Sequence, residues 1–552
     1  MRPGGRFRRR RPRLPLSAIK NREVQKNFGL VLAGKMIGIT AVLGVMFGFT
    51  YFFGAAAGAA AADAGPKVDN LISPINTMWV LVAAFLVFFM QAGFMALEAG
   101  FARSRESVNI MMECIFDTCL CGLLYYAVGF AFQFGEGNGV IGHSYFFLQD
   151  IPATYDYAGI FDTRVAFLAF FLFQFAFADT ASTITSGAMV GRTSFKGDII
   201  YSAVVSGFVY PIIGHWVWGP GGWLGGGGTN FTMGIFDPLV KNDIIFRDFA
   251  GSTVVHTVGG FIALAGAIAL GPRLGRKFAK DGGGPTAPHD MNIAAIGAVM
   301  LWFGWYGFNP GSTLSAMDFE GIGRVAANTT LAACAGGMVA VMFVYPRSKK
   351  WDVGMMINGF LGGLVAVTAP CYWVSPTGAL MIGGVAGIIV PLGVDLLESR
   401  RIDDPIGAVA VHGFCGVWGT LCVGLFATGS YGIPDPVAGT ADASGTIPTV
   451  TGLFYGGGAD QLVAQALGSV TAVILVTSFG LALFLALRKL PGSWNLRLER
   501  DLELEGIDIS EHGLPAYHME FGQGFAYTTY TGKTVGESSI GGPSSDAASE
   551  KV

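Results

Sequence analysis

The sequence predicts an all-α polytopic membrane protein with eleven transmembrane helices, arranged as an inverted five-plus-five repeat and a final helix. Three observations carry this prediction. Of the 552 residues, 52% are hydrophobic and only 13% are charged, whereas a soluble protein has about a quarter of its residues charged. The charges cluster between apolar runs of about 20 residues, which is the length that crosses a bilayer. Two of these runs each hold one histidine followed by glycines.

The first segment, residues 1–64, is predicted to be a basic N-terminus followed by a signal peptide or an extra helix. Arginines and lysines precede an apolar run from about Met36 to Ala62, which ends in small residues. The positive flank places the start of the chain in the cytoplasm. The small residues resemble a signal-peptidase site, and an uncleaved first helix is the alternative.

Residues 65–488 form the predicted membrane domain. Its eleven spans lie at about 75–99, 110–134, 165–190, 198–218, 249–270, 291–310, 323–345, 354–370, 376–397, 405–427 and 464–487. Arginines and lysines follow the odd-numbered spans up to the ninth, and the alternate loops carry few. Because such loops stay in the cytoplasm, we expect a multi-pass protein of the cell membrane, with the mature N-terminus outside and the C-terminus inside.

The two histidines fall at equivalent places in the two halves of this domain. Five spans precede the loop at 272–290 and five follow it, and an odd number per half makes the halves run in opposite directions. His256 lies in the fifth span of the first half and His412 in the fifth span of the second. A pseudo-two-fold axis in the membrane plane would bring their imidazoles together. Since an ionisable residue inside a membrane is costly, such a pair indicates function rather than packing alone.

Asp248 lies eight residues before His256, where the N-cap of the histidine helix would lie. Its carboxylate can accept hydrogen bonds from the first free backbone amides of that helix. We expect this structural role near the site in preference to direct contact with a substrate. The seven cysteines form no C-x-x-C pair and are interpreted as small packing residues.

Residues 489–552 are predicted to form a cytoplasmic C-terminal tail. The tail begins basic, turns acidic near Leu502 and ends in a Gly/Ser-rich sequence typical of disorder. Apolar and acidic residues alternate in its middle. We expect this part to dock either under the membrane domain or on a partner.

Four stretches resemble the ammonium transporters of the Amt/MEP/Rh family, and the resemblance extends over roughly residues 73–518. The stretches are 248–260, 302–312, 407–419 and 505–513. The resemblance implies the ammonium-transporter fold and a homotrimer with one pore in each subunit. It implies ammonium or ammonia as the substrate, and a PII-type regulatory protein as a partner at the cytoplasmic face.

The resemblance also implies two sets of residues along the transport path. The outer substrate site would consist of Phe177, Trp218 and Ser312. The pore would be formed by His256, His412, Phe308 and Trp305, with Phe177 and Phe308 stacked as a gate above the histidines. Packing remains the alternative for the two phenylalanines, and a place in the aromatic belt at the membrane interface is the alternative for Trp218.

The chemistry of these residues suits ammonium. Ammonium is a small cation with four donors, and an aromatic face attracts such a cation by about 0.5–2 kcal/mol. The Ser312 hydroxyl supplies an acceptor. Neutral histidines offer one donor and one acceptor each, so a pair can hold ammonia or pass a proton. Potassium has no proton to give, and an apolar wall penalises any ion that travels intact.

The predicted function is therefore transport of ammonium or ammonia, in which ammonium is recruited outside, deprotonated and conducted through a histidine-lined apolar pore. An ammonium sensor that acts through the tail is the alternative. A membrane metalloenzyme is disfavoured because catalytic zinc needs three protein ligands. We expect no enzyme activity, cofactor, metal or nucleic-acid partner. Conduction of ammonia alone, of ammonia with a proton, or of net ammonium all fit the sequence.

Asp179 is a departure from the expected pattern, since a small neutral residue is expected two positions after Phe177. A carboxylate inside a membrane is expensive unless it is paired or wetted. It is expected to add negative potential near the outer site, to pair across a subunit contact, or to change the selectivity or the charge moved.

Overall fold

The computed structural model describes residues 69–157, 161–225, 246–284, 286–432 and 449–517, together with the pairs 527–528 and 534–535. The chain divides into two units, residues 1–64 and residues 65–552. All described residues belong to the second unit. The predicted signal peptide or extra helix lies outside the described residues, as does the Gly/Ser-rich end of the tail.

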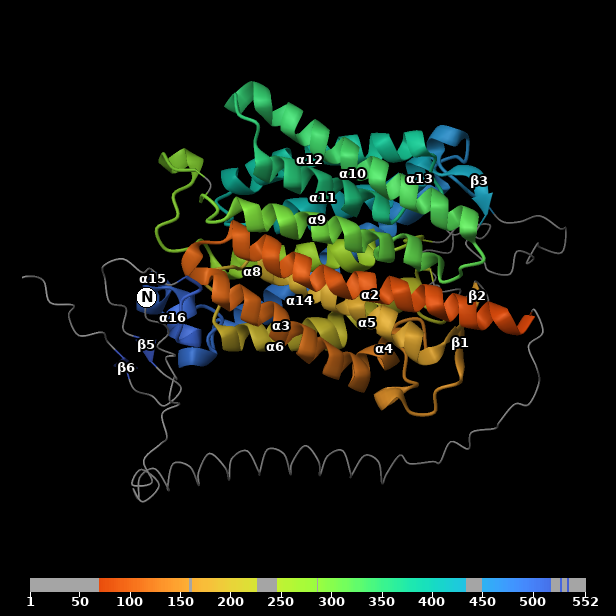
Figure 1. Ribbon diagram of the computed structural model, residues 1–552, viewed down its shortest axis with the longest axis horizontal. Coiled ribbons are helices and arrows are strands. Elements are labelled where there is room, and N and C mark those ends of the chain that lie inside the picture. Colours follow the sequence, from red (N-terminus) through yellow and green to blue (C-terminus); the bar gives the residue numbers. More distant parts are fainter. Residues whose placement is uncertain are drawn as a thin grey trace, which may run out of the picture. The chain divides into compact units, whose positions relative to one another are not determined.

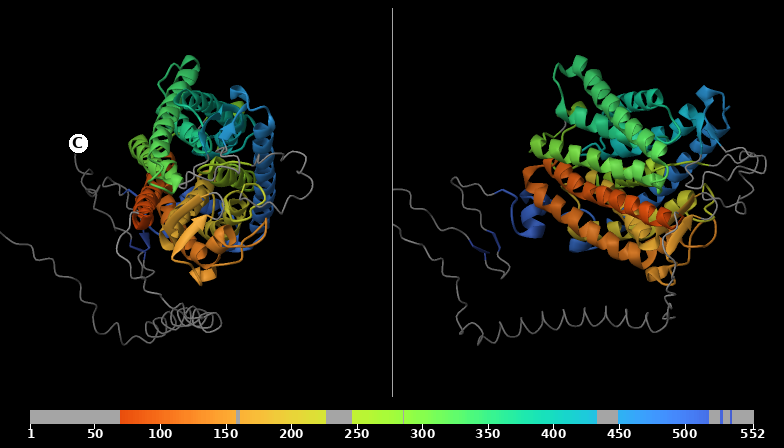
Figure 2. Two further views of the ribbon diagram at one scale, coloured as in Figure 1. Left: turned by 90° about the vertical axis from the view of Figure 1, so that its right-hand side faces the viewer. Right: turned by 45° about the vertical axis from the view of Figure 1, so that its right-hand side comes forward.

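The all-α membrane fold is confirmed, and the described helices correspond one to one to the eleven predicted spans (Figure 1). Ten of them are long and apolar enough to cross a membrane. The eighth span, Val353–Thr368, is shorter. In the left view of Figure 2, the last membrane helix (blue) stands on the opposite side of the bundle from the first (red).

Each half contributes five spans. The first half contains α2 (Asp69–Phe101), α3 (Ser107–Leu124) continued by η3 (Tyr125–Gly129) and α4 (Phe130–Phe134), α5 (Phe167–Gly187), α6 (Phe195–Val204) continued by η5 (Val205–Val209) and α7 (Tyr210–Trp218), and η6 (Ser252–Thr257) continued by α8 (Val258–Leu270). The second half contains α9 (Met291–Phe308) continued by η8 (Pro310–Thr313), α10 (Phe319–Ser348), α11 (Val353–Thr368), α12 (Pro376–Ser399), and η9 (Val409–Phe414) continued by α13 (Cys415–Phe426). The final span is α14 (Asp460–Leu487).

Short elements connect or follow these spans. Three antiparallel pairs of strands are formed by β1 (Thr154–Tyr157) with β2 (Phe161–Ala166), β3 (Thr428–Gly432) with β4 (Thr449–Thr451), and β5 (Tyr527–Thr528) with β6 (Thr534–Val535). Short 3-10 turns lie at Ser104–Glu106, Phe146–Leu148, Ala279–Asp281, Leu453–Tyr455 and Gly492–Trp494. The tail contains α15 (Arg500–Glu505) and α16 (Ile507–His512).

Several helices begin at a residue whose side chain caps the first free amides. Ser194 caps α6, Asp290 caps α9 and Asp318 caps α10, each by accepting from a backbone amide two or three residues later. Asp352 and Ser375 do the same for α11 and α12. These short polar side chains satisfy donors that the helix leaves free, so they fix where each span begins.

Equivalent spans of the two halves pack directly on each other, as a pseudo-two-fold axis requires. The first spans, α2 and α9, lie side by side, and a Cβ added at Gly297 would come within 2.4 Å of the Leu97 amide nitrogen. The fifth spans cross at Gly260, where an added Cβ would come within 2.2 Å of the Gly413 amide nitrogen. Glycine at such crossings lets the two backbones approach closely.

The described part of the tail docks on the membrane domain of its own chain. The Asp508 carboxylate accepts a hydrogen bond from the backbone N–H of Asn109 at 2.8 Å. The ring nitrogen Nε2 of His512 lies 2.9 Å from the Asn109 side-chain oxygen. Glu503 accepts from the Leu274 amide at 2.6 Å, beyond the end of α8. The two short tail helices therefore rest against the ends of spans two and five.

Candidate functional site

A column of aromatic rings lies in the domain between the two halves. Trp218, at the end of α7, meets Phe177 of α5 edge to face, with ring centroids 6.2 Å apart. Phe177 stacks on Phe308 of α9 at 4.0 Å, with an interplanar angle of 21°. Phe308 in turn stacks on His256 at 5.4 Å. Four residues from four different predicted spans thus form one continuous column, which we call the aromatic column.

Exposure decreases along this column. Trp218 is half-buried, whereas Phe177 is 1% exposed and both Phe308 and His256 are 0% exposed. Ser312, also half-buried, joins the column through Phe308, because its hydroxyl donates to the Phe308 carbonyl at 2.7 Å. That donation leaves the lone pairs of the hydroxyl oxygen as acceptors. The column therefore has an open end at Trp218 and Ser312 and a closed stack of phenyl rings behind it.

The two histidines meet at the inner end of the column. The Nδ1 atoms of His256 and His412 lie 3.2 Å apart. Because the two facing atoms are the same kind of nitrogen, one ring must carry the proton on Nδ1 and the other must accept it. The two Nε2 atoms then differ, one bare and the other protonated. The pair is a short hydrogen-bonded chain with a direction.

Trp305 fixes the orientation of His256. Its ring stacks on the imidazole at 5.2 Å with an interplanar angle of 22°. The indole nitrogen donates to the Thr368 hydroxyl at 3.0 Å, and the side chain is 0% exposed. His256 is therefore held between Trp305 and Phe308, and its Nε2 atom is buried without a hydrogen bond among the described residues.

Asp248 caps the His256 helix. Its two carboxylate oxygens accept from the amides of residues 251–254 at 2.8–2.9 Å. Burial raises the pKa of Asp248, and these four amides act in the opposite direction. The Asp248 backbone carbonyl also accepts from the Trp218 indole at 2.7 Å. One residue thus joins the start of the histidine helix to the tryptophan at the open end of the column.

Asp404 is a residue that the sequence analysis missed. It lies eight residues before His412, and its carboxylate accepts from the amides of Gly407, Ala408 and Val409 at 2.9–3.2 Å. The same spacing separates Asp248 from His256. Gly407, with φ +84°, also matches Gly251, with φ +115°, three residues after each aspartate. The repeated pattern Asp-x-x-Gly-x-x-x-x-His was a signal that could have found Asp404.

Asp179 faces away from the aromatic column. Residues two positions apart in a helix point about 200° away from each other, so Asp179 lies opposite Phe177 on α5. It is 0% exposed and near the side chains of Gln91 in α2 and Thr118 in α3. Full burial inside one chain leaves no surface for the expected pairing across a subunit contact, and that alternative was wrong.

Further buried carboxyl groups lie in the same half of the domain and were also missed. Glu98 of α2, Glu113 and Asp117 of α3, and Asp198 of α6 are each at most 5% exposed. Serine, asparagine or tyrosine side chains donate to them. None of these carboxyl groups belongs to an ion pair among the described residues. Their signal in the sequence is an acid inside a predicted span.

A buried ion-pair cluster joins the loops after span five and before span ten. Arg273 makes a bidentate contact with Asp403 at 2.9 and 3.0 Å, and Arg192 donates to the Asp403 carbonyl at 2.7 Å. Burial alone would raise the pKa of Asp403, but its hydrogen bond to Arg273 and the two arginine charges hold it well below its usual range. The cluster therefore ties the ends of the two histidine helices together.

The described residues contain no group of three or more histidine, cysteine, aspartate or glutamate side chains arranged to hold a metal ion.

The profile of the Ammonium Transporter Family matches residues 78–517. Among curated proteins, the chain is 42% identical over 465 residues to the ammonium transporter Amt2 of Archaeoglobus fulgidus, covering 84% of this chain and 92% of that protein. It is 38% identical over 460 residues to ammonium transporter 1 member 3 of Solanum lycopersicum, covering 81% of this chain and 94% of that protein.

Solved structures have the same fold. A structure described as a sensor Amt protein is 35% identical, covers 80% of this chain and 99% of its own, and has a TM-score of 0.67. The Mep2 structure from Saccharomyces cerevisiae is 26% identical, covers 79% of this chain and 90% of its own, and has a TM-score of 0.66.

Proposed function

The chain belongs to the ammonium transporter family, and we propose that it recruits ammonium at the open end of the aromatic column and conducts it past the histidine pair. The single observation that carries this proposal is the continuous order Trp218, Phe177, Phe308, His256, His412, with each ring in contact with the next. The first three residues suit a cation, and the last two suit a molecule that has lost a proton.

Recruitment takes place at Trp218, Phe177 and Ser312. The half-buried indole presents a π face, and a desolvated cation–π contact contributes about 2 kcal/mol at most. The Ser312 hydroxyl oxygen accepts one of the four ammonium protons while its own proton is held by the Phe308 carbonyl. Aromatic faces and one acceptor attract a small cation without the cage of oxygens that potassium needs.

The stacked rings of Phe177 and Phe308 then separate the recruitment site from the histidines. Rings 4.0 Å apart leave no space between them, so passage requires them to move. Beyond them the cost of an intact cation in an apolar pore favours release of the proton, which travels separately along the hydrogen bond between His256 and His412 to the inner side. The histidine pair receives ammonia, because one Nε2 atom can accept from it and the other can donate to it. Potassium has no proton to release and is excluded by the same step.

The protein is proposed to act in the cell membrane, with the start of the mature chain outside and the tail inside. The alternation of arginine and lysine among the loops supports this orientation. Large apolar side chains are exposed on α2, α9 and α14, as faces toward lipid or toward other subunits require. A homotrimer with one pore per subunit, and a PII-type regulator at the cytoplasmic face, follow from the family resemblance.

The test is ammonium-driven current from purified protein in lipid vesicles. We expect a current that saturates with ammonium and is absent with potassium under the same gradient. Wild-type protein that is folded yet carries no ammonium current and takes up no ammonium into the vesicles would contradict transport as the function.

An ammonium sensor is the second candidate, favoured by the 35% identical structure described as a sensor Amt protein. The tail is the expected output, since Glu503, Asp508 and His512 contact the ends of membrane spans. A sensor would bind ammonium and change the exposure of the tail while carrying little current. Limited proteolysis of the tail with and without ammonium, beside the current measurement, separates the two functions.

A further inference from the structure

A stripe of polar residues lies on one face of α3. Asn109, Glu113 and Asp117 follow one another at intervals of four residues, which places them on the same side of the helix. On α5, Asp179 and Ser182 are three residues apart and share a face in the same way. The Ser182 hydroxyl donates to the Asp117 carboxylate at 2.8 Å, so the polar faces of α3 and α5 pack on each other. The acid cluster, as we call it, consists of the carboxyl groups of Glu113, Asp117, Asp179 and, on α6, Asp198.

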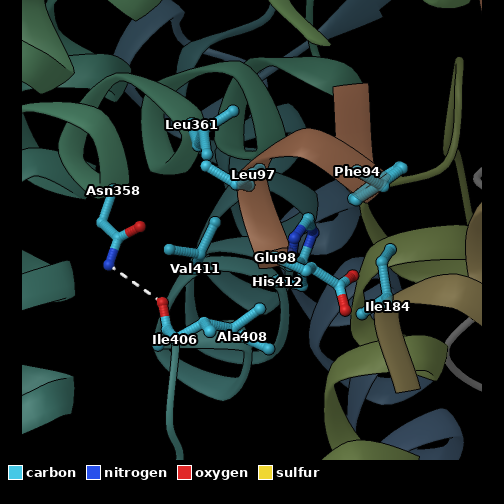
Figure 3. A pocket seen from close by; sticks show the side chains of 11 residues that line it. Phe94, Leu97, Glu98, Ile184, Asn358, Leu361, Ile406, Ala408, Val411 and His412 are labelled. Carbon is cyan, nitrogen blue, oxygen red and sulfur yellow. Dashed lines mark hydrogen bonds between the residues drawn. The ribbon is translucent and has the colours of Figure 1, made fainter. Parts of the chain in front are cut away.

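The acid cluster is separate from the pore. A small cavity beside His412 is lined by Glu98 and, from α5, by Ile184 (Figure 3), and no member of the acid cluster lines it. Glu98 therefore belongs to the pore. Asp179 lies on the side of α5 away from Phe177, since side chains two positions apart on a helix point in nearly opposite directions.

Two polar side chains from other helices point into the acid cluster. Gln91 of α2 lies next to Asp179, and Ser202 of α6 lies next to Asp117. Gln91 is 6% exposed and Ser202 0%. The Gln91 Nε2 atom and the Ser202 hydroxyl have no hydrogen bond among the described residues, and the same holds for both carboxylate oxygens of Asp179 and for Oδ1 of Asp117. Unmatched donors and acceptors that face one another in this way are the partners that a buried water satisfies.

No positive charge balances the acid cluster, since none of its members belongs to an ion pair among the described residues. Asp179 is 0% exposed, and the titratable groups that face it are Asp117, Cys114 and Cys121 of α3. The titratable groups around Asp117 are the carboxyls of Glu98, Glu113, Asp179 and Asp198. An isolated carboxylate away from water is so costly that the group takes up a proton instead. The described side chains form no group arranged to hold a metal ion, so a proton is the charge that compensates this cluster.

The acid cluster opens toward the tail and is closed at its other end. Glu113 lies one turn before Asp117, and it is acted on both by Asp117 and by the half-buried Glu511 of the tail. In the opposite direction α3 continues on the same face with Cys121 and Tyr125, both 0% exposed. The cluster therefore exchanges protons with the solution on the side of the tail.

We propose that Asp117 and Asp179, with Gln91, Ser202 and bound water, form a buried proton-binding site that sets how tightly the outer site captures ammonium. The inference rests on the proposed transport function, because Asp179 follows the gate residue Phe177 by two positions on α5. When the solution on the tail side becomes alkaline, the O–H bond of one carboxyl breaks and its proton passes to water there. The negative charge that remains behind the gate attracts a cation through the poorly polarisable interior. The deprotonated form therefore binds ammonium more tightly than the protonated form.

The experiment measures the ammonium concentration at half-maximal current in vesicles that hold the tail inside, at constant outer pH and varied inner pH. In the wild type this concentration should fall at least about threefold as the inner pH rises, as expected for one unit charge behind the gate. In Asp179→Asn it should stay at the high value found in acid, because an amide has no proton to release. The control is Glu106→Gln, since Glu106 is a buried acid whose charge is balanced by Arg103. Glu106→Gln should keep the dependence of the wild type.

A second readout reports on the proton directly. Infrared difference spectra between acid and alkaline buffer should show the carbonyl stretch of a neutral carboxyl group that disappears in alkali. Asp179→Asn should lose or shift this band, whereas Glu106→Gln should keep it. If Asp179→Asn does not fold, Asp117→Asn removes the other carboxyl of the site and should abolish both the band and the dependence on inner pH.

A wild-type half-saturation that does not change with inner pH would overturn this inference while leaving transport intact, and so would an unchanged dependence in Asp179→Asn. An equal loss in Glu106→Gln would also overturn it, since the effect would then belong to buried acids in general. Absence of both ammonium current and ammonium uptake in the wild type would instead contradict the proposed function, and the infrared band would still test the proton site.

Discussion

The carboxylate of Asp404 caps the His412 helix as the carboxylate of Asp248 caps the His256 helix. Each aspartate lies eight residues before its histidine, and each is followed three residues later by a glycine with positive φ. Both helices then open with a π turn that carries the histidine. The pair of caps fixes where each helix begins, so together they set the distance between the two imidazoles.

Replacing Asp404 by alanine should destabilise the protein by about 1–2 kcal/mol, because three backbone amides lose their acceptor. Transport should fall as well, since the start of the His412 helix moves. Thermal unfolding in detergent and ammonium current measure the two effects. Asp352→Ala is the control, as Asp352 caps α11 through one amide away from the histidines. Equal effects of the two variants on transport would contradict this prediction.

Trp218→Leu should weaken capture of ammonium and leave a folded pore. The loss is one cation–π face, at most about 2 kcal/mol or around 30-fold in affinity. Uptake at limiting ammonium measures it, and uptake at saturating ammonium should change less. Trp223→Leu serves as control, because Trp223 packs on Trp216 and not on Phe177. Unchanged uptake at limiting ammonium in Trp218→Leu would remove Trp218 from the site.

Replacing His256 and His412 together by apolar residues should abolish the ammonium current or remove the discrimination against potassium. The pair is the only place in the column where a proton can be passed along a hydrogen bond between described side chains, here across 3.2 Å. Currents with ammonium and with potassium gradients give the two readouts. His215→Leu is a control, as His215 binds two backbone carbonyls outside the column. A double variant with wild-type current and wild-type exclusion of potassium would show that the histidines only pack.

A cysteine at Glu136 should react with an impermeant thiol reagent from outside the cell, and a cysteine at Lys280 only from inside. Both positions are exposed, in the loops after spans two and five. The reason is the alternation of basic residues among the loops. Replacing the exposed Cys119 and Cys334 first removes their background labelling. The reverse labelling pattern would invert the proposed orientation.

The stability that Asp403 contributes should be lost in acid. Its pKa in the folded protein lies below its usual value, so the folded state binds the proton more weakly than the unfolded state. The contribution is therefore complete above about pH 4, the usual pKa of an aspartate, and declines as the pH falls further. Melting temperatures of wild type and Asp403→Asn should differ most near neutral pH and converge below about pH 4. A constant difference across that range would show that the ion pair does not titrate.

The membrane class and the eleven spans could be predicted from the sequence alone, and the family resemblance added the residues of the aromatic column. Hydrophobic runs and loop charges are local properties, so they can be read without knowing which helices touch. Asp248 could be predicted as a cap for the same reason, since a cap and the helix start that it serves are adjacent in the chain. The family resemblance supplied Phe177, Trp218, Ser312 and Phe308, which periodicity alone could not single out among 44 phenylalanines and ten tryptophans.

The way in which these residues face one another depends on how the helices pack, and that packing was visible only in the structure. The structure placed Asp179 on the side of α5 away from Phe177, because side chains two positions apart on a helix point in nearly opposite directions. It placed Glu98 beside His412, although 314 residues separate them in the chain. Contacts between distant spans depend on helix crossings such as Gly260 with Gly413, where the absence of a side chain lets two backbones meet. That packing is a property of both helices together, and it cannot be predicted from the sequence of either segment alone.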